Sequence, residues 1–286
     1  MKRLSIVLVS ILIVVYLALS VFSSGEEYAA EKLFYKAMKT YSKIIANPDV
    51  APPAMIASVE KDLKSLHKKY PKSAIAKTAH ILIAEMSIAN KKYDEAQATI
   101  KNIMDEYKDD LTILSMAQFM KGTIYEKTGR IDKALAEFRI LRDKYPYTKL
   151  GLQIPLYIGR YYETKNDDGA SQVAYKEAAA YYRKLEENNS KKVLGYMAST
   201  LLIQTYMNLK DFEAAGSALE ATLINYASLA SFNQLLPLVE IIYVDKLKSP
   251  ERAIALYRKS ETLIYKGNRI KELIDKRIAT LEKPKK

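Results

Sequence analysis

The chain has no cysteine and no tryptophan, and it has only 9 glycines and 9 prolines among its 286 residues. Without cysteine it has no disulfide, no thiolate metal ligand and no cysteine nucleophile. A lipid attached to an N-terminal cysteine is excluded for the same reason. The shortage of glycine and proline argues against an all-β fold, whose many turns use both residues.

Motifs that carry catalytic chemistry are also missing. No Gly-x-Gly and no Gly-x-Ser-x-Gly occurs, which excludes a glycine-rich phosphate loop and a serine nucleophile elbow. The two histidines, His67 and His80, lie on predicted helices and neither has a second histidine four residues away, so we expect no metal site and no cofactor. The acidic pairs 109–110 and 167–168 fall where helices should start, and they are interpreted as helix caps. We expect no enzyme; the alternative is a cell-wall hydrolase with a glutamic acid on a helical array, although nothing selects a pair of carboxylates.

The charge of the chain is strongly basic. Lys and Arg number 45 and Asp and Glu number 33, which gives a net charge of +12. Such a balance suits nucleic acid, an anionic membrane surface or acidic partners. The positive residues are interspersed with acidic ones and form no run, so we expect solvated helix faces and no nucleic-acid binding. Binding of an anionic membrane surface or a glycan remains an alternative.

The N-terminal segment has the pattern of an export signal. Met1-Lys2-Arg3 is followed by an almost wholly apolar run over residues 4–22. This run is longer than a usual signal core of about 7–15 residues, and it approaches the roughly 20 residues that span a bilayer. Residues 1–25 are therefore predicted to be a cleaved signal peptide or an uncleaved membrane anchor. Either form places the body in the periplasm, soluble or tethered to the inner membrane.

The rest of the chain has the apolar periodicity of helices. Apolar residues recur at i, i+3, i+4 and i+7, and short breaks such as Tyr70-Pro71 and Tyr145-Pro146 divide the sequence into about thirteen helices. The breaks are regular, since Tyr70 precedes Tyr107 by 37 residues and Tyr107 precedes Tyr145 by 38. A fixed period of this size predicts a solenoid of helical hairpins.

The clearest repeat runs from Ser115 to Pro146. Small residues at Gly122 and Ala134 allow its two helices to cross closely, and Gly129 suits a left-handed turn. Aromatic and apolar side chains then fill the space between the helices, and a proline ends the unit: Tyr125, Phe138, Leu141 and Pro146.

The next repeat, in which Gly159 is the small residue of the first helix, is longer. We expect its turn to have grown by seven residues around 166–169, which would place Ala178 and Tyr182 in the second helix at the crossing. In this register Tyr162 and Tyr182 face inward. Tyr161 and Tyr181 are then freer to act as interface anchors or to cover the neighbouring unit.

These segments resemble tetratricopeptide repeats. The period and the Tyr-Pro unit ends resemble a bacterial envelope subset that includes the β-barrel assembly factor BamD and the Tol-Pal coordinator CpoB. The resemblance implies a periplasmic scaffold for envelope or membrane-protein complexes. BamD-like proteins carry a lipid on a cysteine that this chain lacks, so the hydrophobic leader of residues 4–22 either replaces the lipid or indicates another scaffold. Another similar type attends the secretion translocon and has one N-terminal span.

The resulting prediction is an all-α, tetratricopeptide-type solenoid of about five to six hairpins plus a C-terminal capping helix. A degenerate hairpin is expected at 26–72 after the leader at 1–25. Repeats are expected at 73–264, and the capping helix with a basic tail at 265–286.

Partner proteins are expected in a groove lined by the first helix of each hairpin. Each first helix has one small residue where the second helix crosses it. The positions three before, one after and four after this small residue are expected to be exposed. An apolar stripe among them would suit a helix or an extended peptide, unless these side chains pack against neighbouring helices. No Lys/Asn/Arg cluster is present to clamp a C-terminal carboxylate. The predicted groove residues are Ile81, Glu85, Phe119, Thr123, Leu156, Arg160, Gln204 and Met207.

Overall fold

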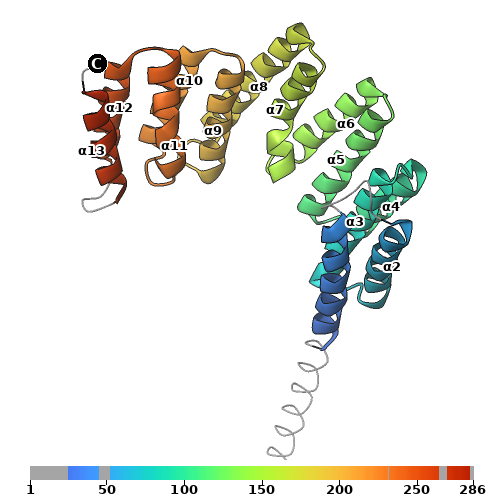
Figure 1. Ribbon diagram of the computed structural model, residues 1–286. Helices are drawn as coiled ribbons and strands as arrows, with labels where there is room; N and C mark the ends of the chain where they lie inside the picture. Colours follow the sequence, from blue (N-terminus) through green and yellow to red (C-terminus); the bar gives the residue numbers. More distant parts are fainter. Residues whose placement is uncertain (1–24, 45–51, 231, 264–268, 284–286) are drawn as a thin grey trace, which may run out of the picture. The chain divides into compact units, whose positions relative to one another are not determined.

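The computed structural model describes residues 25–44, 52–230, 232–263 and 269–283, and no strand occurs in these segments (Figure 1). They form antiparallel helical pairs, which confirms the predicted all-α hairpin array. The predicted export segment, residues 4–22, lies outside the described residues. Within them, none of the helices has the length and apolar character needed to span a membrane.

Contacts divide the chain into two compact units, residues 1–141 and 142–286. In the first unit, residues 25–44 are helical and pair with α2 (Pro53–Lys69). Two further pairs come next along the chain. They are α3 (Ala74–Ala89) with α4 (Tyr93–Glu106), and α5 (Leu111–Lys127) with α6 (Ile131–Lys144), whose last residues belong to the second unit.

The core of the first unit consists of two clusters of buried side chains, and α3 contributes to both. Ala76, Ile83 and Met86 of α3 pack with Val59 and other residues of the first pair. Another face of α3 packs with α4 and α5 through Ile81, Ala84 and Ile88. Nearly every turn of α3 is therefore buried, as expected of an inner helix in a repeat array.

The second unit contains three further pairs and a last helix around one core. Its final pair has a first helix that changes from α to π geometry after Pro237, whose missing N–H removes an α-helical hydrogen bond. The last helix covers the end of the row with Ile274 and Ile278 inward, which is the expected arrangement of a capping helix. The elements are α7 (Lys149–Thr164), α8 (Asp168–Asn188), α9 (Val193–Asn208), α10 (Phe212–Asn225), α11 (Phe232–Val239), η2 (Glu240–Lys246), α12 (Pro250–Glu261) and α13 (Arg269–Leu281).

A turn with one left-handed residue joins the helices of five of the described pairs. The φ of this residue lies between 55° and 72°. After Lys248 the next residue, Ser249, donates its N–H six positions back, to the Tyr243 carbonyl at 2.7 Å, because the preceding helix ends in π geometry. In the other four turns the next residue donates its N–H to a carbonyl five positions back, as Lys92 does to Ser87 at 2.8 Å and Arg130 to Tyr125 at 2.9 Å. This is the Schellman ending of a helix. The left-handed residues are Lys91, Gly129, Asn166, Lys210 and Lys248.

These turns set a common register for the second helix of each pair. Five residues after the left-handed residue stands a small buried side chain, and nine residues after it a larger one. All ten side chains are at most 5% exposed. The small residues are Ala96, Ala134, Ser171, Ala215 and Ala253, and the larger ones are Ile100, Phe138, Tyr175, Leu219 and Tyr257.

The expected long turn after Gly159 is wrong. Only residues 165–167 separate α7 from α8, because Asp167 caps α8 by accepting a hydrogen bond from the Ala170 N–H at 2.9 Å. The additional residues lengthen the helix instead: α8 has 21 residues, whereas α4, α6 and α10 have 14 each. Ser171 and Tyr175, rather than Ala178 and Tyr182, therefore hold the crossing positions.

The inward tyrosine of the first Tyr pair is also not the predicted one. Tyr161 is buried and Tyr162 is only half-buried, while Tyr182 is fully buried as predicted. The residue five positions before the left-handed residue is buried in all five of these pairs, and on α7 this residue is Tyr161. The buried hydroxyl of Tyr182 donates to the Leu152 carbonyl at 2.8 Å, so its polar end has a partner.

Gly122 is expected to be essential for the close crossing of α5 and α6. A methyl group there would lie 2.7 and 2.9 Å from Cδ1 and Cζ of the buried Phe138 ring. Gly122→Ala should lower the free energy of unfolding by about 1–3 kcal/mol, measured by chemical denaturation of the full chain. Gly169→Ala is the matched control, because its new methyl would meet nothing closer than Asp167 Oδ1 at 3.7 Å. A Gly122→Ala chain as stable as the control would contradict this close packing.

Lys210 is expected to carry backbone strain, since its φ is 58°. Lys210→Gly should raise the free energy of unfolding by about 1 kcal/mol, because glycine adopts this conformation without a steric penalty. Lys101→Gly, in the interior of α4, should lower it by a similar amount, about 1 kcal/mol. Equal destabilisation by both substitutions in urea titrations would show that the turn at Lys210 is not left-handed.

Candidate functional site

The predicted groove residues of the first unit lie on α3 and α5. Ile81 is 2% exposed and belongs to the core between α3, α4 and α5. Glu85 reaches solvent one turn later, and the protein atoms around its carboxyl raise its pKa. Phe119 is half-buried with its ring centroid 5.5 Å from that of Phe138, and Thr123 donates to the Phe119 carbonyl at 3.1 Å.

The predicted groove residues of the second unit lie on α7 and α9. Leu156 is 3% exposed and belongs to the core of that unit. Arg160 and Gln204 are exposed, and Met207 is half-buried against the core. The polar predictions thus reach solvent, whereas Leu156 packs inside.

The predicted apolar stripe of Ile81, Phe119 and Leu156 is not an exposed surface. The first helices of successive pairs contact one another, α3 with α5 and α7 with α9. Ile81 and Leu156 lie among buried side chains that include residues of these neighbouring helices. The alternative interpretation, in which such side chains pack against adjacent helices, holds for these two residues.

Exposed apolar side chains outside the predicted groove lie further toward the start of α9. Val193 is 60% exposed and Met197, one turn later, is 39% exposed. They share a helix face with Gln204, because 193, 197 and 204 are at helical spacing. We call Val193, Met197 and Gln204 the α9 surface. The α9 surface could have been predicted from the sequence by following the helix face of Gln204 back toward the start of α9.

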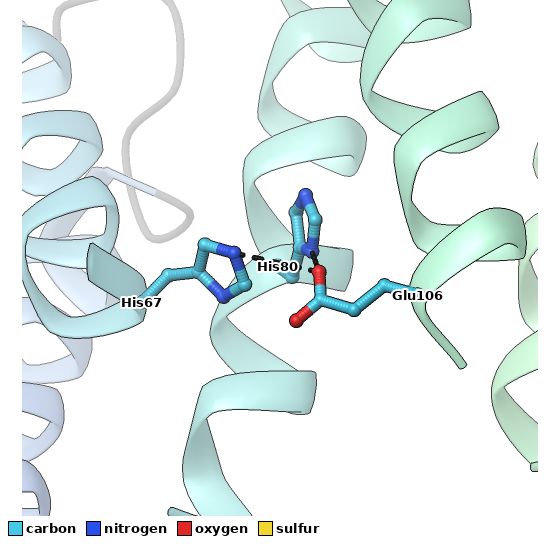
Figure 2. A group of neighbouring side chains, drawn as sticks. All are labelled: His67, His80 and Glu106. Atoms are coloured by element: carbon cyan, nitrogen blue, oxygen red, sulfur yellow. Dashed lines mark ion pairs between the residues drawn. The ribbon is translucent and has the colours of Figure 1, made fainter. Parts of the chain in front are cut away.

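A second cluster unites the two histidines. Figure 2 shows His67 of α2, His80 of α3 and Glu106 at the end of α4 turned toward one another. His80 Nδ1 lies 3.2 Å and His67 Nε2 lies 3.6 Å from Glu106 Oε2. The two imidazole centroids are 4.1 Å apart. Spacing along the sequence does not indicate this meeting of the histidines, because a contact between packed helices does not require spacing along one helix.

The cluster is sheltered and incompletely hydrogen-bonded. His80 is buried, His67 is half-buried and Glu106 is exposed. Burial, and secondarily the neighbouring His67, lowers the pKa of His80 against the opposing effect of Glu106. Within the described residues, the buried His67 Nδ1 has no hydrogen-bond partner, and the 3.2 Å contact of His80 Nδ1 with Glu106 lacks the alignment of a hydrogen bond.

One residue of each acidic pair acts as a helix cap, as predicted. Asp110 accepts a hydrogen bond from the Ile113 N–H at 3.1 Å at the start of α5. Its pKa is lowered, first by the hydrogen bond from Lys77 and then by that backbone N–H. Asp167 plays the corresponding part at the start of α8.

Comparison with known proteins gives a family model that matches the sequence and solved structures of low similarity. The sequence model of the tetratricopeptide repeat-like domain matches residues 2–145. A tetratricopeptide repeat protein from Parabacteroides merdae is 14% identical over 90% of this chain and 100% of its own, with a TM-score of 0.34. The crystal structure of BtubC (BKLC) from P. vanneervenii is 13% identical over 88% of this chain and 92% of its own, with a TM-score of 0.38. No curated protein matches the chain in sequence.

The family match begins near the N-terminus and ends just after α6, so it includes the described pairs of the first unit. The left-handed turns and the buried crossing residues continue the same register through α12, beyond the matched segment. The chain belongs to the tetratricopeptide repeat-like domain family.

Proposed function

We propose that this chain is an exported scaffold that binds other proteins and supports the assembly or maintenance of a cell-envelope complex. Tetratricopeptide-like repeats typically bind proteins, and this chain carries their hairpins. The observation that carries the proposal is the α9 surface. Its apolar side chains are exposed to solvent, and α9 is the first helix of its hairpin.

The α9 surface suits a helix or an extended peptide with apolar side chains. Val193 and Met197 offer adjacent apolar contacts, and Gln204 offers a hydrogen-bonding group on the same face. Arg160 is exposed on α7, the helix that packs beside α9. A partner with an apolar stripe and an acidic flank would therefore be complementary to this part of the second unit.

The proposed location rests on the N-terminal sequence. Lys2 and Arg3 precede the apolar run of residues 4–22, and this order favours translocation of the repeat region across the membrane. Since the chain has no cysteine, attachment to a membrane would depend on that run rather than on a lipid.

The binding surface can be tested with matched substitutions. We expect Val193→Glu combined with Met197→Glu to abolish specific capture of envelope proteins from solubilised membranes, because each carboxylate would be buried unpaired against an apolar partner. Val173→Glu is the control, since Val173 lies on α8 and is 58% exposed, almost the same as Val193. Captured proteins would be compared by quantitative mass spectrometry.

Equal capture by the double variant and the control would show that α9 is not the binding surface. Recovery of cytosolic proteins alone by the unaltered chain would contradict the envelope scaffold. Helix content by circular dichroism should be the same for all variants, because glutamate has a good helix propensity and these side chains lie at the surface.

Export can be tested on the full chain in bacterial spheroplasts. We expect added protease to digest the repeat region while a cytosolic marker stays intact, and the mass of the purified chain to show whether residues 1–25 are retained. Protection of the repeats until the inner membrane is lysed would contradict the proposed location.

A further inference from the structure

The cluster of His67, His80 and Glu106 has the donors of a transition-metal site. Two imidazoles and a carboxylate form one of the known three-ligand sets for Zn²⁺. The chain has two histidines in total and no cysteine, and the fold brings both histidines to one carboxylate. Three different helices supply the donors, so the cluster is a product of the packing and not of a local sequence motif.

The distances approach those of a metal centre. A tetrahedral ion with bonds near 2.0–2.1 Å requires donor atoms roughly 3.3 Å apart. The two nitrogen–oxygen distances are 3.2 and 3.6 Å. One donor atom from each residue can be chosen so that all three lie within 4.8 Å of one another. Rotation of the half-buried His67 ring would bring its donor nitrogen closer to the other two donor atoms.

Hydrogen bonding also favours a cation at this place. His80 Nδ1 is buried and lies 3.2 Å from Glu106 Oε2, but this contact lacks the alignment of a hydrogen bond. A buried polar atom with a poorly formed hydrogen bond is unfavourable, and coordination would satisfy it.

The charges of neighbouring groups are compatible with a positive ion. Lys77, on the same helix as His80, is paired with Asp110 at 2.9 Å, so its charge is compensated. The Tyr107 ring covers His80 edge-on at a centroid distance of 6.0 Å and helps to exclude water from that side. Glu106 is exposed, which gives an ion access from solvent.

We propose that His67, His80 and Glu106 bind one divalent transition-metal ion of the zinc class. The ion joins α2, α3 and α4, and so fastens the first two hairpins of the first unit to each other. Metal binding to a folded site stabilises the fold. Fewer than four protein donors are supplied, so a water or a partner's side chain completes the coordination.

Metal titration of the full chain, purified in detergent without a polyhistidine tag, tests the proposal. We expect isothermal titration calorimetry to give one Zn²⁺ per chain. Saturating Zn²⁺ should raise the midpoint of thermal unfolding by on the order of 5 °C. Mg²⁺ should do neither, because it prefers an all-oxygen site.

Variants identify the ligands. His67→Gln and Glu106→Gln should each weaken Zn²⁺ binding by about tenfold or more, since even outer-shell changes have effects of that size. Asp105→Asn, beside Glu106 and also exposed, should bind Zn²⁺ like the unaltered chain. Because His67 is only half-buried, its variant should keep its helix content, and circular dichroism would verify this. Absence of saturable binding, or binding that His67→Gln leaves unchanged, would overturn the proposal.

Discussion

Five hairpins in the described part of this chain depend on a backbone turn in which one residue adopts positive φ and the next donates a hydrogen bond back into the first helix, five positions back in four of them and six in the turn at Lys248. The turn fixes where the second helix starts, and therefore which of its side chains reach the crossing. The small and large residues at five and nine positions after the turn are buried in all five of these pairs, although their identities change. The position of the buried side chain at the crossing is thus more restricted than its residue type, since Phe138, Tyr175 and Leu219 occupy equivalent positions.

The repeat period and the unit around Gly122 could be predicted because glycine, proline and alanine mark a turn, an end and a close crossing directly. The other turns were less visible, since Lys91, Lys210 and Lys248 have no special preference for positive φ and occupy it under the constraint of packing. Asp167-Asp168-Gly169 has the composition of a loop, yet Asp167 caps a helix. The seven additional residues were consequently assigned to the turn instead of to α8.

Candidate sites were harder to predict than the fold, for a related reason. Whether Ile81 or Leu156 is exposed depends on the neighbouring first helix, which the periodicity of one helix does not describe. The meeting of His67, His80 and Glu106 likewise requires three helices to be in place. Exposed polar groups such as Arg160 and Gln204 were predictable, because a solvated position needs no knowledge of its neighbours. The array therefore sets both kinds of site through contacts between successive hairpins.

The central claim is that this chain acts by binding a protein on the first helices of its hairpins. Site-specific photocrosslinking in living cells tests it most directly, with a photoreactive residue placed at Met197 of α9 or, for comparison, at Val173 of α8. We expect a discrete crosslinked partner from position 197 and none from position 173. Partner adducts from position 173 alone would contradict the claim.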